Sequence, residues 1–293
     1  MQMAWSLVLG ACTGVLGACA DIVVETDIAY DDRFAITRMD AYLPSGTPRG
    51  AVVVIHGGGW RAGLSRDGMA DHSRRLAAAG YAAFNIDYRV TPEGGEFPHA
   101  VQDCICALAY VRAHAVDYAI DPARIAALGY SAGGHLVSML GTAAGDPVVA
   151  PDCAAAGDTS PVAAVISGAG PEDMQLMPEV DVVVDFVGGT KAAAPERYVQ
   201  ASPISYVAPG APPFLFITGA SDWFVDPEHA HRMQDALAAV GTDTRLLEIP
   251  GGGHLLNRGA SGASWDVELS IDTPEAWAAM LDFLDRTIGG GAR

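Results

Sequence analysis

The chain has 293 residues, enough for one large α/β domain or two small ones. Half of the residues are hydrophobic and 18% are charged, a balance that provides a sizeable core and argues against intrinsic disorder. The formal net charge is −18, with 35 acidic residues against 17 basic ones, so the surface should repel nucleic acids and anionic membranes. We interpret the acidity mainly as a solvated surface.

The first 20 residues form an uncharged, apolar segment that is followed by acidic sequence. This segment resembles the hydrophobic region of a secretory signal, without the usual positive charge in front of it. Residues 16–19, Leu-Gly-Ala-Cys, resemble a bacterial lipobox, in which Cys19 would be lipidated after cleavage. The sequence therefore predicts a leader over residues 1–20 and an exported protein, either free or tethered to a membrane through Cys19. A cytoplasmic protein is the alternative.

From residue 22 onward, segments typical of strands alternate with segments typical of helices. Residues 22–30 and 35–43 predict an antiparallel hairpin that ends in a Pro-Ser-Gly turn cluster. The apolar run 51–55 predicts a short strand buried on both faces. Further strands are predicted at 81–86, 124–128, 163–167, 214–218 and 244–249, and helices at 68–80, 98–116, 131–140, 227–240 and 274–288.

This alternation predicts an α/β fold with a mostly parallel sheet, helices on both faces and an antiparallel hairpin at one edge. We assign residues 21–288 to one domain. Residues 169–212 interrupt the alternation, but core strands are predicted on both sides of them, so they form an insertion over the edge of the sheet. The insertion is either a lid or an irregular crossover that contains a helix.

Three cysteines follow the leader: Cys104, Cys106 and Cys153. Cys104 and Cys106 lie two positions apart on a predicted helix, so they point to different faces and cannot pair with each other. Core packing is the default interpretation for all three, and a disulfide from Cys153 to one of the others is the alternative in an exported protein. The sequence has no CxxC or Cys/His metal spacing, and we expect neither a metal nor a cofactor.

The segment 129–133, Gly-Tyr-Ser-Ala-Gly, matches the G-x-S-x-G pattern of a nucleophile elbow. The pattern alone is weak in a chain this rich in glycine, but here it follows a predicted strand and opens a predicted helix, as an elbow requires. The flanking glycines remove side chains where strand and helix crowd the turn. We therefore predict Ser131 as a nucleophile.

A serine nucleophile needs a general base, and the base needs an orienting carboxylate. His254 follows the last predicted strand, in the loop where a base can reach a serine at the end of the sheet, and we predict it as the base. Asp222 lies in the loop directly after the preceding strand and is the predicted acid. Asp226 precedes a proline at a helix start and is better interpreted as an N-cap.

The other histidines after Ser131 are assigned no catalytic role. His135 lies one turn along the elbow helix, where we expect packing or a polar contact. His229 and His231 lie near the start of a helix, and we expect both at the surface.

Three glycines in a row, in Ile-His-Gly-Gly-Gly-Trp at 55–60, follow the first parallel strand. Attack on a carbonyl produces an oxyanion that preset backbone N–H groups must meet, and HGGG-type loops lie in this place. A phosphate cradle does not fit, because neither G-x-G-x-x-G nor G-K-[ST] occurs here. We predict the N–H of Ala132, directly after Ser131, as one donor to the oxyanion and expect the other donors in this glycine loop.

Together these motifs resemble the α/β-hydrolase superfamily, and more narrowly the bacterial carboxylesterases of the feruloyl-esterase-like and hormone-sensitive-lipase-like groups, with kynurenine formamidase as a near relation. The resemblance extends over residues 22–288 and rests on 56–60, 87–89, Phe97-Pro98, Asp103, 121–125, 129–135, Ser202-Pro203, Pro212-Pro213, Asp222 and His254. Hormone-sensitive-lipase-like enzymes often carry a long helical cap before the HGGG motif, and this chain has a predicted hairpin there instead. Trp60 fits the feruloyl-esterase-like and formamidase-like groups better.

The resemblance implies a serine carboxylesterase that hydrolyses small acyl esters through an acyl-enzyme on Ser131. It also implies that the N–H groups of Gly58, Gly59 and Ala132 form the oxyanion hole. The alternatives are an amide or formamide hydrolase of the arylformamidase type, or a catalytically inactive binding protein on the same fold. Trp60 is the predicted substrate-binding residue. Trp60, Trp223 and Phe224 are each either pocket-lining residues or core and loop anchors.

Overall fold

The computed structural model describes residues 21–154, 157–254 and 273–290. Within these residues, one eight-stranded sheet has the order β1-β2-β4-β3-β5-β6-β7-β8. β1 and β2 pair antiparallel, β2 pairs antiparallel with β4, and all later neighbours are parallel. The strands are β1 (Ile22–Ala29), β2 (Arg38–Pro44), β3 (Ala51–Ile55), β4 (Ala82–Ile86), β5 (Ile125–Tyr130), β6 (Ala164–Gly168), β7 (Phe214–Gly219) and β8 (Thr244–Ile249).

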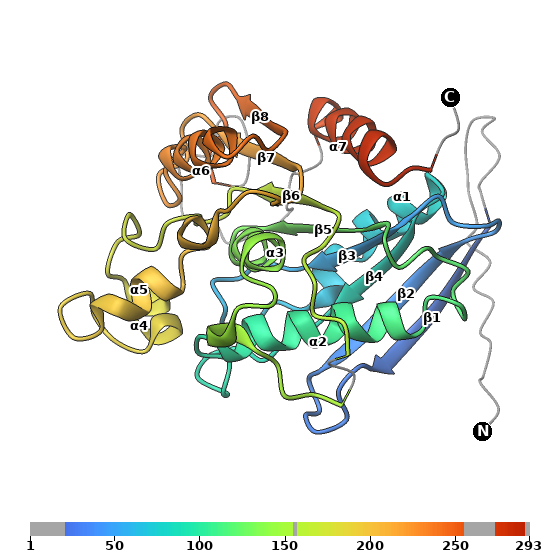
Figure 1. The fold of residues 1–293 in the computed structure, drawn as a ribbon, viewed down its shortest axis with the longest axis horizontal. Helices are drawn as coiled ribbons and strands as arrows, with labels where there is room; N and C mark the ends of the chain where they lie inside the picture. Colours follow the sequence, from blue (N-terminus) through green and yellow to red (C-terminus); the bar gives the residue numbers. More distant parts are fainter. Residues whose placement is uncertain (1–20, 155–156, 255–272, 291–293) are drawn as a thin grey trace.

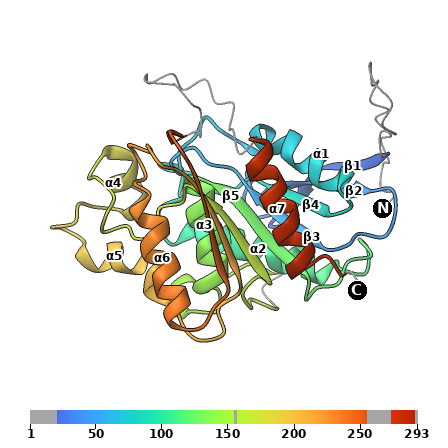
Figure 2. The same ribbon diagram turned by 90° about the horizontal axis from the view of Figure 1, so that it is seen from above.

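The helices cover both faces of the sheet (Figures 1 and 2). α2, α3 and α6 contribute to one apolar cluster, and α1 and α7 contribute to the other. Neighbouring residues of β3 alternate between the clusters, because successive strand side chains point to opposite faces. The helices are α1 (Ala70–Ala78), α2 (His99–Ala113), α3 (Ala132–Thr142), α4 (Asp181–Val187), α5 (Pro195–Gln200), α6 (Glu228–Ala239) and α7 (Pro274–Thr287).

The predicted α/β fold with its N-terminal antiparallel hairpin is confirmed, and most element boundaries agree within a few residues. The predicted helix 68–80 is divided: a 3-10 turn, Arg66–Met69, precedes α1. Gly80 ends this region as expected, since it adopts φ +93° and its N–H donates to the carbonyl of Ala77 at 2.9 Å. The hairpin contains a bulge between Glu25 and Ile28 that the alternating pattern did not reveal.

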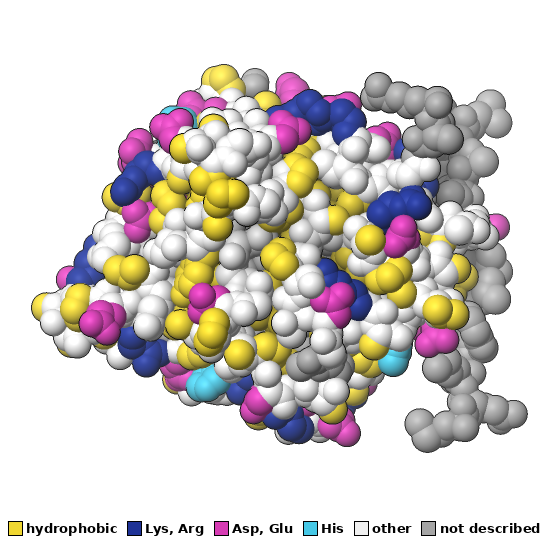
Figure 3. All heavy atoms as spheres, viewed as in Figure 1, with side chains coloured by type: hydrophobic (Ala, Val, Ile, Leu, Met, Phe, Trp, Pro, Cys, Tyr) yellow, Lys and Arg dark blue, Asp and Glu magenta, His cyan; other side chains and the backbone are white. Residues whose placement is uncertain are grey.

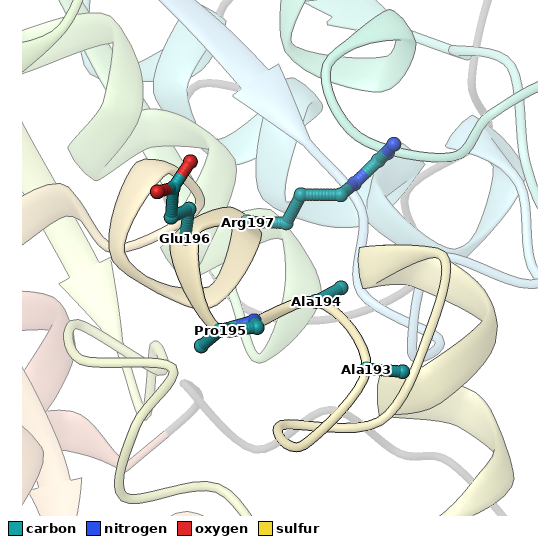
Figure 4. A pocket seen from close by; sticks show the side chains of 5 residues that line it. All are labelled: Ala193, Ala194, Pro195, Glu196 and Arg197. Carbon is teal, nitrogen blue, oxygen red and sulfur yellow. The ribbon is translucent and has the colours of Figure 1, made fainter.

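Residues 169–212, the predicted insertion, connect β6 to β7 through α4, α5 and the 3-10 turn Pro203–Tyr206. Figure 1 shows α4 and α5 together at one end of the molecule, far from α1 and α7. An open pocket at the start of α5 is lined by Ala193, Ala194, Pro195, Glu196 and Arg197 (Figure 4). It contains none of the predicted site residues.

A disulfide joins Cys106 on α2 to Cys153, 47 residues later in the chain. The alternative interpretation of Cys153 is therefore the correct one, and core packing alone is wrong for these two residues. Cys104 is a buried free thiol, as the default interpretation expects. The spacing of the cysteines excluded only a bond between Cys104 and Cys106. It could not identify the partner of Cys153, because that depends on how the segment before β6 packs against α2.

Acidic and basic side chains are scattered over the face of the molecule shown in Figure 3. No helix among the described residues is long and apolar enough to cross a membrane. The predicted leader and Cys19 lie outside the described residues.

Candidate active site

Ser131 occupies a sharp turn between β5 and α3, with φ +56° and ψ −120°. This backbone conformation is strained for a residue with a side chain, and the turn persists because its surroundings hold it. The N–H of Ser131 donates to the carbonyl of Gly168 at 2.7 Å. A Cβ added to Gly129 would lie 2.3 Å from the oxygen of Gly133, and one added to Gly133 would lie 2.2 Å from the oxygen of Ile55. Both glycines of the motif are therefore required by backbone contact.

The structure brings the three predicted triad residues together. Nδ1 of His254 lies 2.7 Å from Oδ2 of Asp222, and Nε2 of His254 lies 2.9 Å from Oγ of Ser131. A carboxylate only accepts hydrogen bonds, so Nδ1 is the donor and Nε2 of the neutral ring is free to accept from the serine hydroxyl. The side chain of Asp222 is completely buried. Its other oxygen, Oδ1, accepts the N–H groups of Phe224 and Val225, both at 2.9 Å, which fixes the carboxylate.

The loops that carry the acid and the base lie against each other. A Cβ on Gly219 would lie 2.3 Å from the oxygen of Gly252, and the N–H of Ser221 donates to the same oxygen at 2.8 Å. Gly251 adopts φ +70°. The triple glycine 251–253 thus permits a tight turn in direct contact with the Asp222 loop.

The competing acid and histidines have other roles. Oδ1 of Asp226 accepts the N–H of Glu228, the first residue of α6, at 2.9 Å, so Asp226 makes a capping contact one residue before Pro227, the N-cap position of that helix. His135 is buried, and its Nε2 donates to the carbonyl of Ala201 at 2.7 Å. Burial lowers the pKa of His135 to about 4, so the ring is neutral near pH 7.

The prediction that His229 and His231 both lie at the surface is wrong for His229. His231 is exposed and contacts Glu248 at 2.9 Å. His229 is buried, and its Nδ1 accepts the N–H of Asp173, at the start of the insertion, at 3.2 Å. Burial lowers the pKa of His229 to about 4. The helical pattern of α6 did not reveal this contact because the insertion covers that face.

The predicted oxyanion loop, residues 56–60, lies beside the elbow. A Cβ on Gly57 would lie 2.7 Å from the oxygen of Tyr130 and 3.3 Å from Cβ of Ser131. Gly58 and Gly59 have φ angles of +106° and +60°. The N–H groups of Gly58, Gly59 and Ala132 donate no hydrogen bond to any residue that the structure describes. Their role as an oxyanion hole remains a prediction.

His56 holds the start of this loop in place. Its Nδ1 donates to the carbonyl of Gly57 at 2.7 Å, and its ring stacks on Tyr88 with centroids 4.5 Å apart. The hydroxyl of Tyr88 donates to the carbonyl of His56 at 3.1 Å. The segment after β4 therefore supports the oxyanion loop, a role the sequence pattern did not assign to it.

Trp60 is buried, with 2% of its surface exposed, although it was predicted to bind substrate. Its indole stacks on Phe186 of α4 with centroids 4.2 Å apart and meets the ring of His135 edge-on at 5.3 Å. The structure thus places Trp60 as an anchor between the oxyanion loop and the insertion. A direct contact of Trp60 with substrate remains a prediction.

Two further contacts join α4 to the residues on either side of Trp60. A Cβ on Gly59 would lie 2.5 Å from Cγ2 of Val182, and Arg61 forms an ion pair with Asp185. The ion pair is partly exposed and contributes little by itself. Consecutive residues 59–61 nevertheless each contact α4, so the insertion supports the oxyanion loop directly.

Glu172, in the insertion, was not identified from the sequence. Its side chain is fully buried, and Oε1 accepts hydrogen bonds from Ser138 on α3 at 3.0 Å and Ser167 on β6 at 2.6 Å. Oε2 is buried without a hydrogen bond from any described residue. Burial raises the pKa of Glu172 to about 8, although both serines oppose this shift. The carboxyl group is therefore mostly protonated at neutral pH.

Groups of three or more His, Cys, Asp or Glu side chains suited to a metal ion do not occur in the described part of the chain.

Comparison with known proteins gives a family match: the BD-FAE family model matches residues 39–237. Esterase LipC of Mycobacterium tuberculosis (strain ATCC 25618 / H37Rv) is 37% identical over 216 residues, covering 71% of this chain and 53% of the relative. The probable carboxylic ester hydrolase LipM of the same strain is 30% identical over 233 residues, covering 75% and 53%. The chain spans about half the length of these curated relatives.

Among solved structures, a truncated form of a carbohydrate esterase from gut microbiota superposes with a TM-score of 0.79 at 26% identity. The match covers 94% of this chain and 99% of that one. The two folds therefore correspond over nearly the whole of this chain.

The contact between α4 and Gly59 predicts a specific energetic coupling. Gly59→Ala should lower the free energy of unfolding by about 2–3 kcal/mol, because the new methyl group meets the stiff, β-branched Val182 and the backbone has a positive φ. In a Val182→Ala background the same substitution should cost only about 1 kcal/mol. Urea unfolding of the four variants measures the coupling.

Gly241→Ala is the matched control, since Gly241 has φ +81° with open space around it. It should show the backbone cost alone, with or without Val182. Equal costs of Gly59→Ala in both backgrounds would refute the contact.

The buried Glu172 predicts a pH dependence of stability. Its pKa rises from 4.5 to about 8 on folding, so the folded protein retains a proton that the unfolded chain releases between these values. The stabilising contribution is complete below the lower pKa and is lost as the pH rises through the upper one. Glu172→Gln should remove a decline of up to about 1.4 kcal/mol per pH unit in this window.

Urea unfolding at about pH 5.5 and 7.5 measures this difference. Glu196→Gln, which changes an exposed residue of α5, is the control and should leave the slope unchanged. A Glu172→Gln variant with the same slope as the parent would show that Glu172 is ionised in the folded protein.

Proposed function

The chain belongs to the BD-FAE family of α/β-hydrolases, and on that premise we propose that it is a serine carboxylesterase that hydrolyses small acyl esters through an acyl-enzyme. The single observation that carries the proposal is the hydrogen-bonded series Ser131–His254–Asp222, with distances of 2.9 and 2.7 Å. The relatives named above as esterases support it, as does the carbohydrate esterase among the similar structures.

In the first half of the reaction, Oγ of Ser131 attacks the ester carbonyl carbon while Nε2 of His254 takes the hydroxyl proton. Asp222 keeps the imidazole in the tautomer that can accept this proton and stabilises the imidazolium that forms. The two N–H groups on Oδ1 hold the carboxylate in place during the transfer. The tetrahedral intermediate then expels the alcohol, whose oxygen takes the proton back from Nε2 of His254.

The negative oxygen of the intermediate lies between the elbow and the glycine loop in this mechanism. The free N–H of Ala132 approaches it from the start of α3, where the helix dipole also favours negative charge. The N–H groups of Gly58 and Gly59 approach from the other side. Water then attacks the carbonyl carbon of the acyl-enzyme while Nε2 of His254 takes a proton from it. The bond from this carbon to Oγ of Ser131 breaks, the carboxylic acid leaves, and the proton moves from His254 to Oγ.

The proposed substrates are esters with short acyl groups, including esters of carbohydrates, because the gut-microbiota neighbour is named a carbohydrate esterase. Val182 and Phe186 of α4 pack against Gly59 and Trp60, which supports a short acyl group if the acyl chain extends toward α4.

Ser131→Ala should reduce hydrolysis of p-nitrophenyl acetate and butyrate by at least about 1,000-fold, since the nucleophile is lost. Ser205→Ala, at an exposed serine of the insertion, should retain full activity. A fluorophosphonate probe should label the parent protein at Ser131 and leave Ser131→Ala unlabelled.

Parent turnover no faster than that of Ser131→Ala, without labelling, would contradict the enzyme assignment and favour a binding protein. A strong preference for N-formylkynurenine over the esters would instead assign formamide hydrolysis to the same triad.

We also propose that the protein is exported and tethered through a lipid on Cys19. The Cys106–Cys153 disulfide supports export, because structural disulfides persist in oxidising compartments. Palmitate should label the full-length chain produced in a bacterial host, and Cys19→Ser should abolish the label. An unlabelled, cytosolic chain with free thiols at Cys106 and Cys153 would contradict this proposal.

A further inference from the structure

Trp223 is exposed directly beside the triad. The residue is 74% exposed. Trp223 is the only exposed Phe, Tyr or Trp among residues 21–154, 157–254 and 273–290. It follows Asp222 in the chain. A large apolar ring left in water at this position loses the stabilisation that burial would give it, so its location calls for a functional explanation.

The backbone that carries Trp223 is held firmly. Oδ1 of the buried Asp222 accepts the N–H groups of the next two residues after Trp223, Phe224 and Val225. Val225 is itself buried. The indole therefore projects from an anchored turn, and the entropic cost of using it as a binding surface is small.

A row of aromatic rings leads from Trp223 to the base. The ring centroids of Trp223 and Phe224 are 5.6 Å apart, and those of Phe224 and His254 are 5.4 Å apart in an edge-on contact. Phe224 is half-buried. A molecule that contacts both Trp223 and Phe224 would thus extend from the solvent to the imidazole of His254.

The chemistry of ester cleavage decides which part of the substrate meets this row. The ester carbonyl oxygen faces the glycine loop, which α4 covers. His254 must place a proton on the oxygen of the departing alcohol, so that oxygen lies within hydrogen-bond distance of Nε2. The groups attached to the alcohol therefore extend past His254, toward Phe224 and Trp223.

We propose that Trp223 and Phe224 form a subsite for the leaving alcohol, and that this alcohol carries a ring with a flat apolar face. Both an aromatic ring and a pyranose ring have such a face, and indole stacks against either. The exposed Asp226 and Glu228 follow on the same loop, so the subsite favours an uncharged ring over an anionic one. The inference rests on the proposed esterase function.

The subsite acts only while the alcohol is attached. In acylation, the bond from Oγ of Ser131 to the carbonyl carbon forms, the bond from that carbon to the alcohol oxygen breaks, and the proton on His254 moves to this oxygen. The ring then leaves with the alcohol. The acetyl-enzyme that water hydrolyses is the same for every acetate ester, so deacylation does not depend on Trp223.

The test compares acetate esters with and without a ring: phenyl acetate, a mono-O-acetylated methyl xylopyranoside, and ethyl acetate. Trp223→Ala should lower kcat/KM about three- to tenfold for one or both ring esters, as expected for loss of a stacking contact. Ethyl acetate should change less than about twofold, and so should the deacylation rate from single-turnover experiments. The ester that loses activity identifies whether the ring is aromatic or a pyranose.

Two variants serve as controls. Trp223→Phe retains an aromatic face and should retain most of the activity on the ring esters. Val116→Ser removes another exposed apolar side chain, on the connection between α2 and β5, and should change none of the rates.

The subsite is refuted if Trp223→Ala leaves both ring esters unchanged, or if ethyl acetate loses activity to the same extent. Absence of turnover by the parent protein on all three esters would instead overturn the proposed function itself, and the subsite with it. Normal hydrolysis of ethyl acetate by both proteins separates these two failures.

Discussion

β3 and β5 are adjacent parallel strands in register, with Ile55 opposite Gly129, and the site depends on this pairing. Both strands end at the same edge of the sheet, so the loops that follow them meet there. The contact is close enough that Gly57, Gly129 and Gly133 could not carry a Cβ without striking backbone atoms. This approach brings the glycine loop beside the serine of the elbow.

The same principle assembles the acid and the base at the other half of the sheet. β7 and β8 are also parallel neighbours, with Gly219 opposite Ile249, and their loops share the contact between Gly219 and Gly252. Asp222 and His254 are 32 residues apart in the chain but lie on neighbouring loops. Strand register thus sets both halves of the site. Ser131 follows β5, and only β6 separates β5 from β7 in the sheet order.

The insertion links the site to the rest of the fold. α4 contacts residues 59–61, Glu172 bonds to α3 and β6, and Asp173 bonds to His229 of α6. Its contacts therefore reach the oxyanion loop, the elbow helix and the helix that follows the acid. A substitution in residues 169–212 can change the site without touching a catalytic group, because the loops with positive φ angles rely on such external support.

The sequence by itself determined the strands and helices outside residues 169–212, in their chain order, the strand–turn–helix that carries Ser131, and the glycine loop. It also singled out the three residues that the structure joins by hydrogen bonds. These features depend on local patterns: apolar runs, turn residues and a motif placed between a strand and a helix. Only the tertiary structure decided that Trp60 is buried and Trp223 exposed, that Cys153 pairs with Cys106, and that Glu172 and His229 are buried. Each of these depends on how distant segments pack around a side chain. Glu172 belongs to the irregular insertion, and Trp60 and His229 are covered by that insertion. Its packing follows from contacts across the fold, and no periodic pattern in the chain records them.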